Sequence, residues 1–455
     1  MNLPAPIRNL IDRITGWFNS KELAKRFAGA VFWSFAGAVS QKLLLLATSF
    51  LCMRIMGKED CGKLSIVRNT IQIFILFGAV GMGSTATKFI AEFRDTRREK
   101  LTGIYSIVNL LSISFGLLTT VVVLCFAGMI ADYLKDPGLV HCIRIGALYL
   151  FFSIVNSIQT GILAGLEKFM EIAIVTAVSG VVEFVCIVLG AKYFGVMGAL
   201  LGYGAGFMCM TLMNQIAIWW SRCPELRFSC GSIRLNEVRS MLAFSLPLVG
   251  SSLIVSPVMW YPQTLLVRDS GFSAQGIYDA ANQWRMVFLF IPSALSRIVL
   301  PLLSNLNGKN NSGSYTRILK INLLVNGGTT FIFLVLFAAA APLVLRGYDL
   351  PLSCYPTFVL LAASTVFSSL AAVFGQAIIS KSRTWIGFLF NLCWGAMLIS
   401  FSVLFLKMGM KETALSLGML LAYFFHTLFQ GVYFYFAFLR ERGPRAETWN
   451  GNQSR

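Results

Sequence analysis

The chain has 455 residues and a net charge of +18, with 56% hydrophobic and only 13% charged residues. Soluble globular domains carry about 25% charged residues, so this chain lacks the charge needed to cover a water-facing surface. Its mean hydropathy is +0.71, and its apolar runs reach the length of about 20 residues that a transmembrane helix needs. These features exclude a cytosolic enzyme, a disordered chain, a fibrous protein and an outer-membrane barrel. They predict an all-α polytopic membrane protein.

The chain opens with a basic segment, residues 1–27, that has apolar residues at helical spacing. Such a segment fits an amphipathic helix on the cytoplasmic leaflet, or a helical lead-in packed on the protein. We expect no cleavable signal peptide, because no short apolar region with a small-residue cleavage site precedes the first long run. The apolar residues of this segment are Ile7, Leu10, Ile11, Ile14, Trp17 and Phe18.

Twelve apolar runs follow, each long enough to cross a bilayer as a helix. We expect them to form an N-lobe at 28–221 and a C-lobe at 240–438, with a cytoplasmic linker at 222–239 and a cytoplasmic tail at 439–455. The runs are 28–53, 64–90, 102–127, 139–165, 170–191, 195–219, 240–267, 277–304, 321–345, 355–380, 384–406 and 413–438.

Basic residues predict the orientation of these spans. If the N-terminus is cytoplasmic, 23 Lys and Arg fall in cytoplasmic segments, nine fall outside and six lie within spans. Lys and Arg concentrate in cytoplasmic loops, so both termini are predicted to be cytoplasmic. This also explains the positive charge without nucleic-acid binding.

An internal repeat relates the two predicted lobes. The pattern R-x-x-G-x-x-x-x-G begins at Arg54 and again at Arg268, an offset of 214 residues. The same offset aligns Gly161 with Gly375 and maps spans onto spans. Each half has six spans, so the two halves point the same way. A parallel duplication of this kind is typical of secondary transporters, which hold the substrate between the repeats.

Charged residues inside spans are costly and therefore mark candidate functional sites. Lys42 and Arg285 lie deepest and are expected to face a cavity, whereas Lys88, Arg297, Arg144 and Asp279 lie near span ends and can snorkel to the interface. Arg68 is intermediate, and Glu183 either pairs with a cation or carries a proton. Six cations against two acids predict a substrate with an anionic group, such as a carboxylate, phosphate or diphosphate.

Motifs for catalysis and for metal binding are missing from the sequence. There is no G-x-x-x-x-G-K-[ST] phosphate loop, no G-x-S-x-G and no H-E-x-x-H. The ten Cys are scattered and read as small apolar residues rather than as metal ligands or disulfides. The longest loop, about 20 residues, is too short for a catalytic domain. We expect no enzyme activity, no cofactor and no metal.

Three segments resemble a known family. Residues 54–62 are similar to the R-x-L-G-x-x-x-[FY]-G segment of the polysaccharide-lipid flippases in the multidrug/oligosaccharidyl-lipid/polysaccharide exporter superfamily. Residues 81–93 resemble the end of the second span of that family, and residues 161–169 resemble its turn between spans four and five. Met56 and Cys61 depart from the pattern, which has Leu and usually an aromatic residue there.

The resemblance implies a multi-pass protein of the bacterial inner membrane that moves an undecaprenyl-diphosphate-linked oligosaccharide outward for O-antigen or capsule synthesis. The family fold implies a cleft lined by spans one, two, seven and eight, with Lys42, Arg68, Arg285 and Arg297 as the substrate-binding residues. Glu183 and Asp279 are then candidates for coupling or for ion pairing. Membrane lipids are expected partners, with a polysaccharide polymerase and glycosyltransferases as further candidates.

Two other functions remain open from the sequence. One is a cation-coupled multidrug exporter of the same superfamily, although exporters of cationic drugs tend to need an acidic cleft. The other is a membrane component of a polysaccharide assembly complex that does not itself transport.

Overall fold

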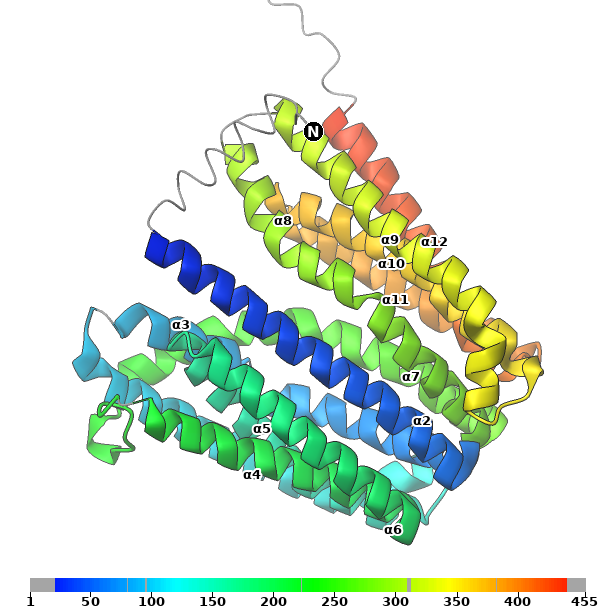
Figure 1. Cartoon of the computed structure of the whole chain (residues 1–455), viewed down its shortest axis with the longest axis horizontal. Helices are drawn as coiled ribbons and strands as arrows, with labels where there is room; N and C mark the ends of the chain where they lie inside the picture. Colours follow the sequence, from blue (N-terminus) through cyan, green and yellow to red (C-terminus); the bar gives the residue numbers. More distant parts are fainter. Residues whose placement is uncertain are drawn as a thin grey trace, which may run out of the picture. The chain divides into compact units, whose positions relative to one another are not determined.

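The computed structural model describes residues 21–79, 81–94, 96–221, 223–308, 312–381 and 383–439 (Figure 1). Most of the predicted N-terminal amphipathic segment, residues 1–20, and the tail from residue 440 lie outside the described residues. Within these ranges the chain forms helices and connecting turns and no strand. The chain divides into two compact units, Met1–Ser256 and Pro257–Arg455.

The first unit is a bundle of long helices in which α6 packs against both α2 and α5, and α5 packs against α4 and the short α3 (Figure 1). Lipid offers the backbone no hydrogen-bond partners, so apolar spans of this length satisfy their own N–H and C=O groups by forming helices. The elements of this unit are α2 (Lys21–Ala79), α3 (Met82–Phe93), η1 (Arg98–Lys100), α4 (Leu101–Tyr133), α5 (Leu139–Gly165), α6 (Phe169–Trp220), η2 (Cys230–Ser232) and the start of α7 (Leu235–Phe288).

The second unit is a bundle around α10, which packs against α8, α9 and α12, while α11 packs chiefly on α12. The rest of α7 also belongs to this unit. The further elements are α8 (Phe290–Gly308), α9 (Ser312–Gly347), η3 (Leu352–Cys354), α10 (Tyr355–Ser380), α11 (Thr384–Lys407), α12 (Lys411–Phe434) and the π-helical η4 (Tyr435–Leu439).

Three of the long helices each contain a glycine that breaks the helical backbone. Gly57 in α2 has φ 78° and ψ 173°, and Gly271 in α7 has φ 84° and ψ 176°. Gly195 in α6 has φ 58° and ψ −139°. These values lie in a region that almost only glycine adopts. Each of these helices therefore consists of two helical rods that meet at the glycine.

Eight helical stretches of the described residues are long and apolar enough to cross a membrane. Two of them, Phe35–Phe93 and Phe169–Trp220, contain one of the glycine breaks. The protein is thus an all-helical, multi-pass membrane protein. The expectation of twelve spans stays a prediction, because a long stretch that contains a glycine break can hold more than one span.

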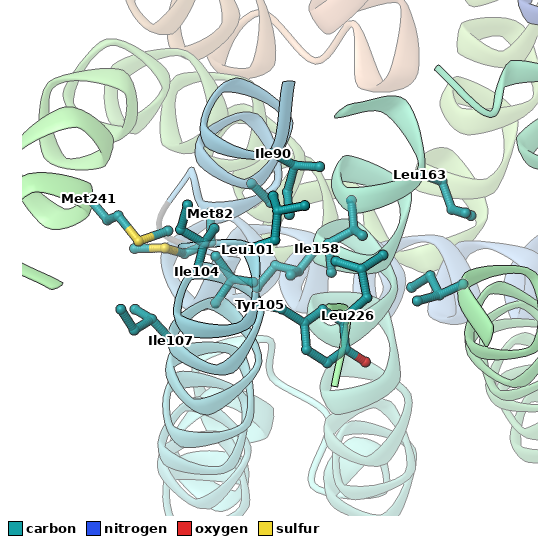
Figure 2. Packing of buried hydrophobic residues seen from close by; sticks show 14 residues of the cluster. Met82, Ile90, Leu101, Ile104, Tyr105, Ile107, Ile158, Leu163, Leu226 and Met241 are labelled. Carbon is teal, nitrogen blue, oxygen red and sulfur yellow. The ribbon is translucent and has the colours of Figure 1, made fainter. Parts of the chain in front are cut away.

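A buried apolar cluster fills one end of the first unit (Figure 2). Residues of α3, α4 and α5 form it, including Met82, Ile104 and Ile158. Leu226 from the segment after α6 and Met241 from α7 reach into the same cluster (Figure 2).

The predicted linker is fastened to the start of α4. Thr102 Oγ1 donates a hydrogen bond to the Glu225 carbonyl at 2.8 Å, and the Ser229 N–H donates to Ser106 Oγ at 2.8 Å. The linker thus belongs to the first unit, and the boundary between the two compact units lies after it, at Ser256 inside α7.

The crossing of α3 and α5 depends on two glycines. A Cβ atom on Gly161 would lie 2.2 Å from the Gly83 carbonyl oxygen, far inside contact distance. Thr87 Oγ1 donates to the carbonyl oxygens of both glycines, at 3.0 Å each. The two helices therefore meet backbone to backbone at this point.

Candidate functional site

Arg68 is held on a tyrosine within the first unit. It lies in the second rod of α2, and its Nη1 donates a hydrogen bond to Tyr203 Oη of α6 at 3.0 Å. The guanidinium carbon also lies 5.9 Å from the centre of the Tyr203 ring, within the range of a cation–π contact. Arg68 is half-buried and Tyr203 is buried. This contact joins α2 to the second rod of α6.

Two further polar groups surround this arginine. The Tyr149 ring of α5 lies 6.3 Å from the Tyr203 ring, and its hydroxyl has no hydrogen-bond partner in the described part of the chain. Glu183, in the first rod of α6, lies within electrostatic reach of Arg68. A Cβ atom on Gly206 would lie 2.5 Å from the Glu183 Cβ, so this carboxylate sits at a close crossing of the two rods.

Arg285 forms a comparable site in the second unit. It lies in the second rod of α7 and is 3% exposed. Its Nε donates a hydrogen bond to Ser364 Oγ of α10 at 3.3 Å, and its guanidinium carbon lies 5.4 Å from the Tyr423 ring of α12. This is the single side-chain hydrogen bond of Arg285 within the described chain. A nearly buried guanidinium thus has further donors available.

Tyr423 also belongs to a cluster of aromatic and polar side chains on α11 and α12. Its ring centre lies 5.2 Å from that of Trp394 and 6.4 Å from that of His426. His426 is 5% exposed, and one of its ring nitrogens contacts Gln430 Nε2 at 3.0 Å. Trp394 Nε1 and His426 Nδ1 have no hydrogen-bond partner among the described residues.

The sequence-based predictions did not include this cluster. The available signal was weak: His426 and Gln430 lie four residues apart, and so on one face of a helix, within a run that is otherwise apolar.

The two arginines occupy similar places in their units. Each belongs to the rod that follows a glycine break, at Gly57 in α2 and at Gly271 in α7. Each places its guanidinium near the ring of a tyrosine from another helix, Tyr203 of α6 for Arg68 and Tyr423 of α12 for Arg285. An arginine held in this way keeps its charge and can present its planar fork to an anion.

The remaining predicted site residues lie apart from these two contacts. Lys42 in α2 is half-buried, and no polar contact of its side chain is recorded in the described chain. Asp279 is half-buried, and its Oδ2 accepts a hydrogen bond from Gln283 Nε2 at 3.3 Å. Arg297 belongs to α8, but its side chain lies outside the described part of the structure. Glu183 is the one predicted acid that lies near a predicted cation of the first unit.

Among the described residues, no group of three His, Cys, Asp or Glu side chains is placed to hold a metal ion. The charged groups brought into the helical bundles include two guanidiniums that lie near tyrosine rings, those of Arg68 and Arg285. Such groups bind phosphate or carboxylate oxygens by paired N–H donors. The chemistry that this arrangement supports is therefore recognition of an anion.

The sequence profile of a family described as polysaccharide biosynthesis protein matches residues 28–307 of this chain. A putative O-antigen transporter of Shigella flexneri is 24% identical over 281 residues, which cover 60% of this chain and 66% of the relative. The EPS I polysaccharide export inner membrane protein EpsE of Ralstonia solanacearum is 27% identical over 204 residues, or 43% of this chain and 45% of the relative.

A third relative, the succinoglycan biosynthesis transport protein ExoT of Rhizobium meliloti, is 22% identical over 271 residues, which cover 58% of this chain and 51% of that protein. The matched regions thus span from about half to just under two thirds of these relatives' lengths.

Solved structures of transporters share the fold. An inward-facing multidrug resistance MATE family transporter of the MOP superfamily superposes with a TM-score of 0.75 at 13% identity, covering 89% of this chain and 96% of its own. A MOP superfamily transporter from Pyrococcus furiosus, described as having a binding pocket of reverse polarity, gives a TM-score of 0.64 at 14% identity, with 90% and 95% covered. At such identities the likeness establishes the fold alone.

Proposed function

The chain belongs to the polysaccharide biosynthesis protein family, and we propose that it moves an undecaprenyl-diphosphate-linked oligosaccharide across the bacterial cytoplasmic membrane. The observation that carries this proposal is the family match over residues 28–307. The names of the three relatives, which concern O-antigen, EPS I and succinoglycan transport, support the same substrate class. The product would supply O-antigen, capsule or exopolysaccharide synthesis at the outer leaflet.

The proposed architecture is twelve spans in two duplicated lobes. Three pairs of residues with positive φ support the duplication, because the members of each pair lie 214 residues apart. In the pair Lys135 and Asp349, both residues follow a long helix and neither is glycine. The backbone conformation that these two residues share therefore does not depend on shared residue identity. The pairs are Gly57 and Gly271, Lys135 and Asp349, and Gly195 and Gly409.

Hydrogen bonds after the third predicted span of each half support the same offset. The Asp136 N–H donates to the Ala131 carbonyl at 3.2 Å, and the Leu350 N–H donates to the Leu345 carbonyl at 2.9 Å. We place the N-lobe at 28–221, the linker at 222–239 and the C-lobe at 240–438, with both termini in the cytoplasm. Two parallel lobes are the arrangement in which a transporter alternates access by rocking one lobe against the other.

Arg68 and Arg285 are the proposed contacts for the diphosphate. Keeping a guanidinium inside a span costs at least a few kcal/mol, so such a residue is expected to serve binding. Its planar fork matches the paired oxygens of a diphosphate, which a Lys ammonium contacts only as a point charge. Lys42 and Arg297 are proposed as further cationic contacts, to the diphosphate or to acidic sugars.

Glu183 and Asp279 are proposed to tune these arginines or to take part in ion coupling. The charge of Arg68 acts on Glu183, which supports an ion-pair role for that carboxylate. Asp279 lies six residues before Arg285, and both charges act on the hydroxyl of Tyr278, the residue that directly precedes Asp279.

Export of cationic drugs is the second candidate function, and the fold shared with multidrug transporters is compatible with it. Buried arginines oppose it, because they repel a cationic substrate. A non-transporting role in a polysaccharide assembly complex would leave the buried guanidiniums without a ligand.

Deletion of the gene tests the proposal. The cells should accumulate the lipid-linked oligosaccharide in the inner leaflet, and a plasmid copy of the wild-type gene should restore surface polysaccharide. The Arg285→Gln protein, present at normal amounts, should fail to restore export, and Arg285→Lys should restore part of it. Unchanged drug sensitivity together with lost polysaccharide would separate the flippase from the drug exporter.

A further inference from the structure

The α3 helix presents an exposed lysine, Lys88, on the face that points away from the core of the first unit. Met82, Thr85, Ala86 and Ile90 face the core. Lys88 lies on the opposite face, where its exposed neighbours at helical spacing are the small Ser84 and Ala91 and the acid Glu92. Glu92 forms no ion pair with Lys88 among the described residues, and the Lys88 ammonium faces outward from α3.

Two phenylalanine rings hold this ammonium in place. Lys88 Nζ lies 4.0 Å from the centre of the Phe244 ring of α7 and 5.1 Å from that of Phe89. The two rings meet edge to face, with centres 6.2 Å apart. Cation–π contacts of this kind orient an ammonium without neutralising its charge.

Two other cations at this end of the unit are paired with carboxylates. Arg94 forms an ion pair with Glu167, and Lys100 Nζ lies 3.9 Å from Glu237. The Lys88 ammonium lies against two aromatic rings and forms no hydrogen bond or ion pair among the described residues. Its full positive charge therefore remains available to an anion.

The rings continue as a row along the same end. Phe89 stacks on Phe93 with centres 6.4 Å apart, and Lys100 Nζ lies 5.3 Å from the Phe93 ring. A row of aromatic rings beside an unpaired cation matches a ligand with an apolar chain and an anionic head. It does not match a free sugar, which needs several hydrogen-bond donors and acceptors.

We propose that Lys88, on the shelf formed by Phe89 and Phe244, is the loading site at which the polyprenyl diphosphate of the substrate first binds. The inference rests on the proposed function, which puts this end of the unit in the cytoplasm. Lys88 contacts the diphosphate, and the rings contact the first isoprene units. The site is separate from Arg68, which lies in the second rod of α2 rather than in α3.

Native mass spectrometry tests this site. It measures the binding of undecaprenyl diphosphate to the purified full-length protein in detergent. Lys88→Gln should weaken binding about tenfold, the usual effect of losing one charge-assisted hydrogen bond. Lys88→Arg should stay within about threefold of wild type, because it keeps both charge and ring contact. Phe244→Leu should lose about threefold by removing the cation–π contact. Arg97→Gln, which removes an exposed cation nearby, should bind as the wild type does.

Two results would overturn the loading site. One is a Lys88→Gln affinity for undecaprenyl diphosphate that is no weaker relative to wild type than the affinity of Arg97→Gln. The other is equally strong binding of phosphatidylglycerol that Lys88→Gln also removes, which would mark a site for bulk anionic lipid. The deletion experiment decides the proposed function separately: if wild-type protein supports export while Lys88→Gln binds normally, only the loading site is wrong.

Discussion

Replacing Gly161 by Ala is the sharpest test of how the first unit is packed. The added Cβ would lie 2.2 Å from the Gly83 carbonyl oxygen and within 3.0 Å of two further backbone atoms of Gly83. Backbone cannot rotate away as a side chain can, so α3 and α5 must separate by about 1 Å. Such a shift also strains the hydrogen bond that Thr87 of α3 donates to the Gly161 carbonyl of α5.

The expected loss in the free energy of unfolding follows from three contributions. Overpacking of this kind costs about 1–3 kcal/mol, and loss of one buried hydrogen bond costs about 1 kcal/mol. Alanine has a helix propensity about 1 kcal/mol better than glycine, which offsets the second cost. The free energy of unfolding should therefore fall by about 1–3 kcal/mol.

Thermal unfolding of the detergent-solubilised protein measures this loss. The apparent Tm of Gly161→Ala should drop by several degrees. Gly128→Ala is the matched control, because no atom lies within 4 Å of the added Cβ in α4. Its apparent Tm should stay level or rise slightly. Equal behaviour of the two variants would refute the backbone contact between α3 and α5.

Three further predictions concern topology, the linker and the glycine breaks. In a cysteine-depleted protein, a cysteine replacing exposed Gly231 should be shielded from an impermeant reagent outside the cell, and one replacing exposed Asp349 should react; outside labelling of both contradicts the topology. Burial, together with the hydrogen bond and charge of Glu225, raises the pKa of the Cys223 thiol. In a protein that retains only Cys223, maleimide labelling should therefore be slow near neutral pH and become faster as the pH rises. Glu225→Gln should speed the labelling. Equal labelling rates with Glu225 and with Gln at about pH 7.5 would count against the contact between Cys223 and Glu225. Gly271→Ala should cost about 1–3 kcal/mol, because only glycine readily adopts its backbone angles, and an unchanged apparent Tm would argue against the break.

The membrane helices were readable from the sequence because hydropathy reports directly on burial in lipid. The R-x-x-G-x-x-x-x-G pattern also pointed to its own backbone feature. Its first glycine, Gly57 in one copy and Gly271 in the other, has the non-helical angles that divide α2 and α7. A short motif can predict such a break since the cause, the missing Cβ, is local.

Contacts between helices were beyond the sequence-based predictions. Arg68 and Tyr203 are 135 residues apart, and their meeting depends on the tilt and register of α2 against α6. Helical spacing shows which residues share a face of one helix but not what that face meets. For this reason Lys42 and Arg68 looked alike as charges within spans, although only Arg68 has a recorded side-chain partner in the described chain.

The position of the linker shows the same limit. Composition marked residues 222–239 as polar and basic, which predicts a boundary between lobes. In the structure this segment is hydrogen-bonded to α4 through Thr102 and Ser106, and its role as the boundary between lobes stays a prediction. A polar segment can be bound to one unit by a few hydrogen bonds and one apolar anchor, here Leu226.

Reconstitution of the purified protein in liposomes tests the central claim most directly. Undecaprenyl-diphosphate-linked oligosaccharide is placed in one leaflet, and its exposure on the other is followed with a lectin or glycosidase that cannot cross the membrane. The account predicts transfer by the wild-type protein and little transfer by Arg285→Gln protein of equal thermal stability. Transfer no faster than in protein-free liposomes, under every imposed ion gradient, would contradict the proposal that this protein is a flippase.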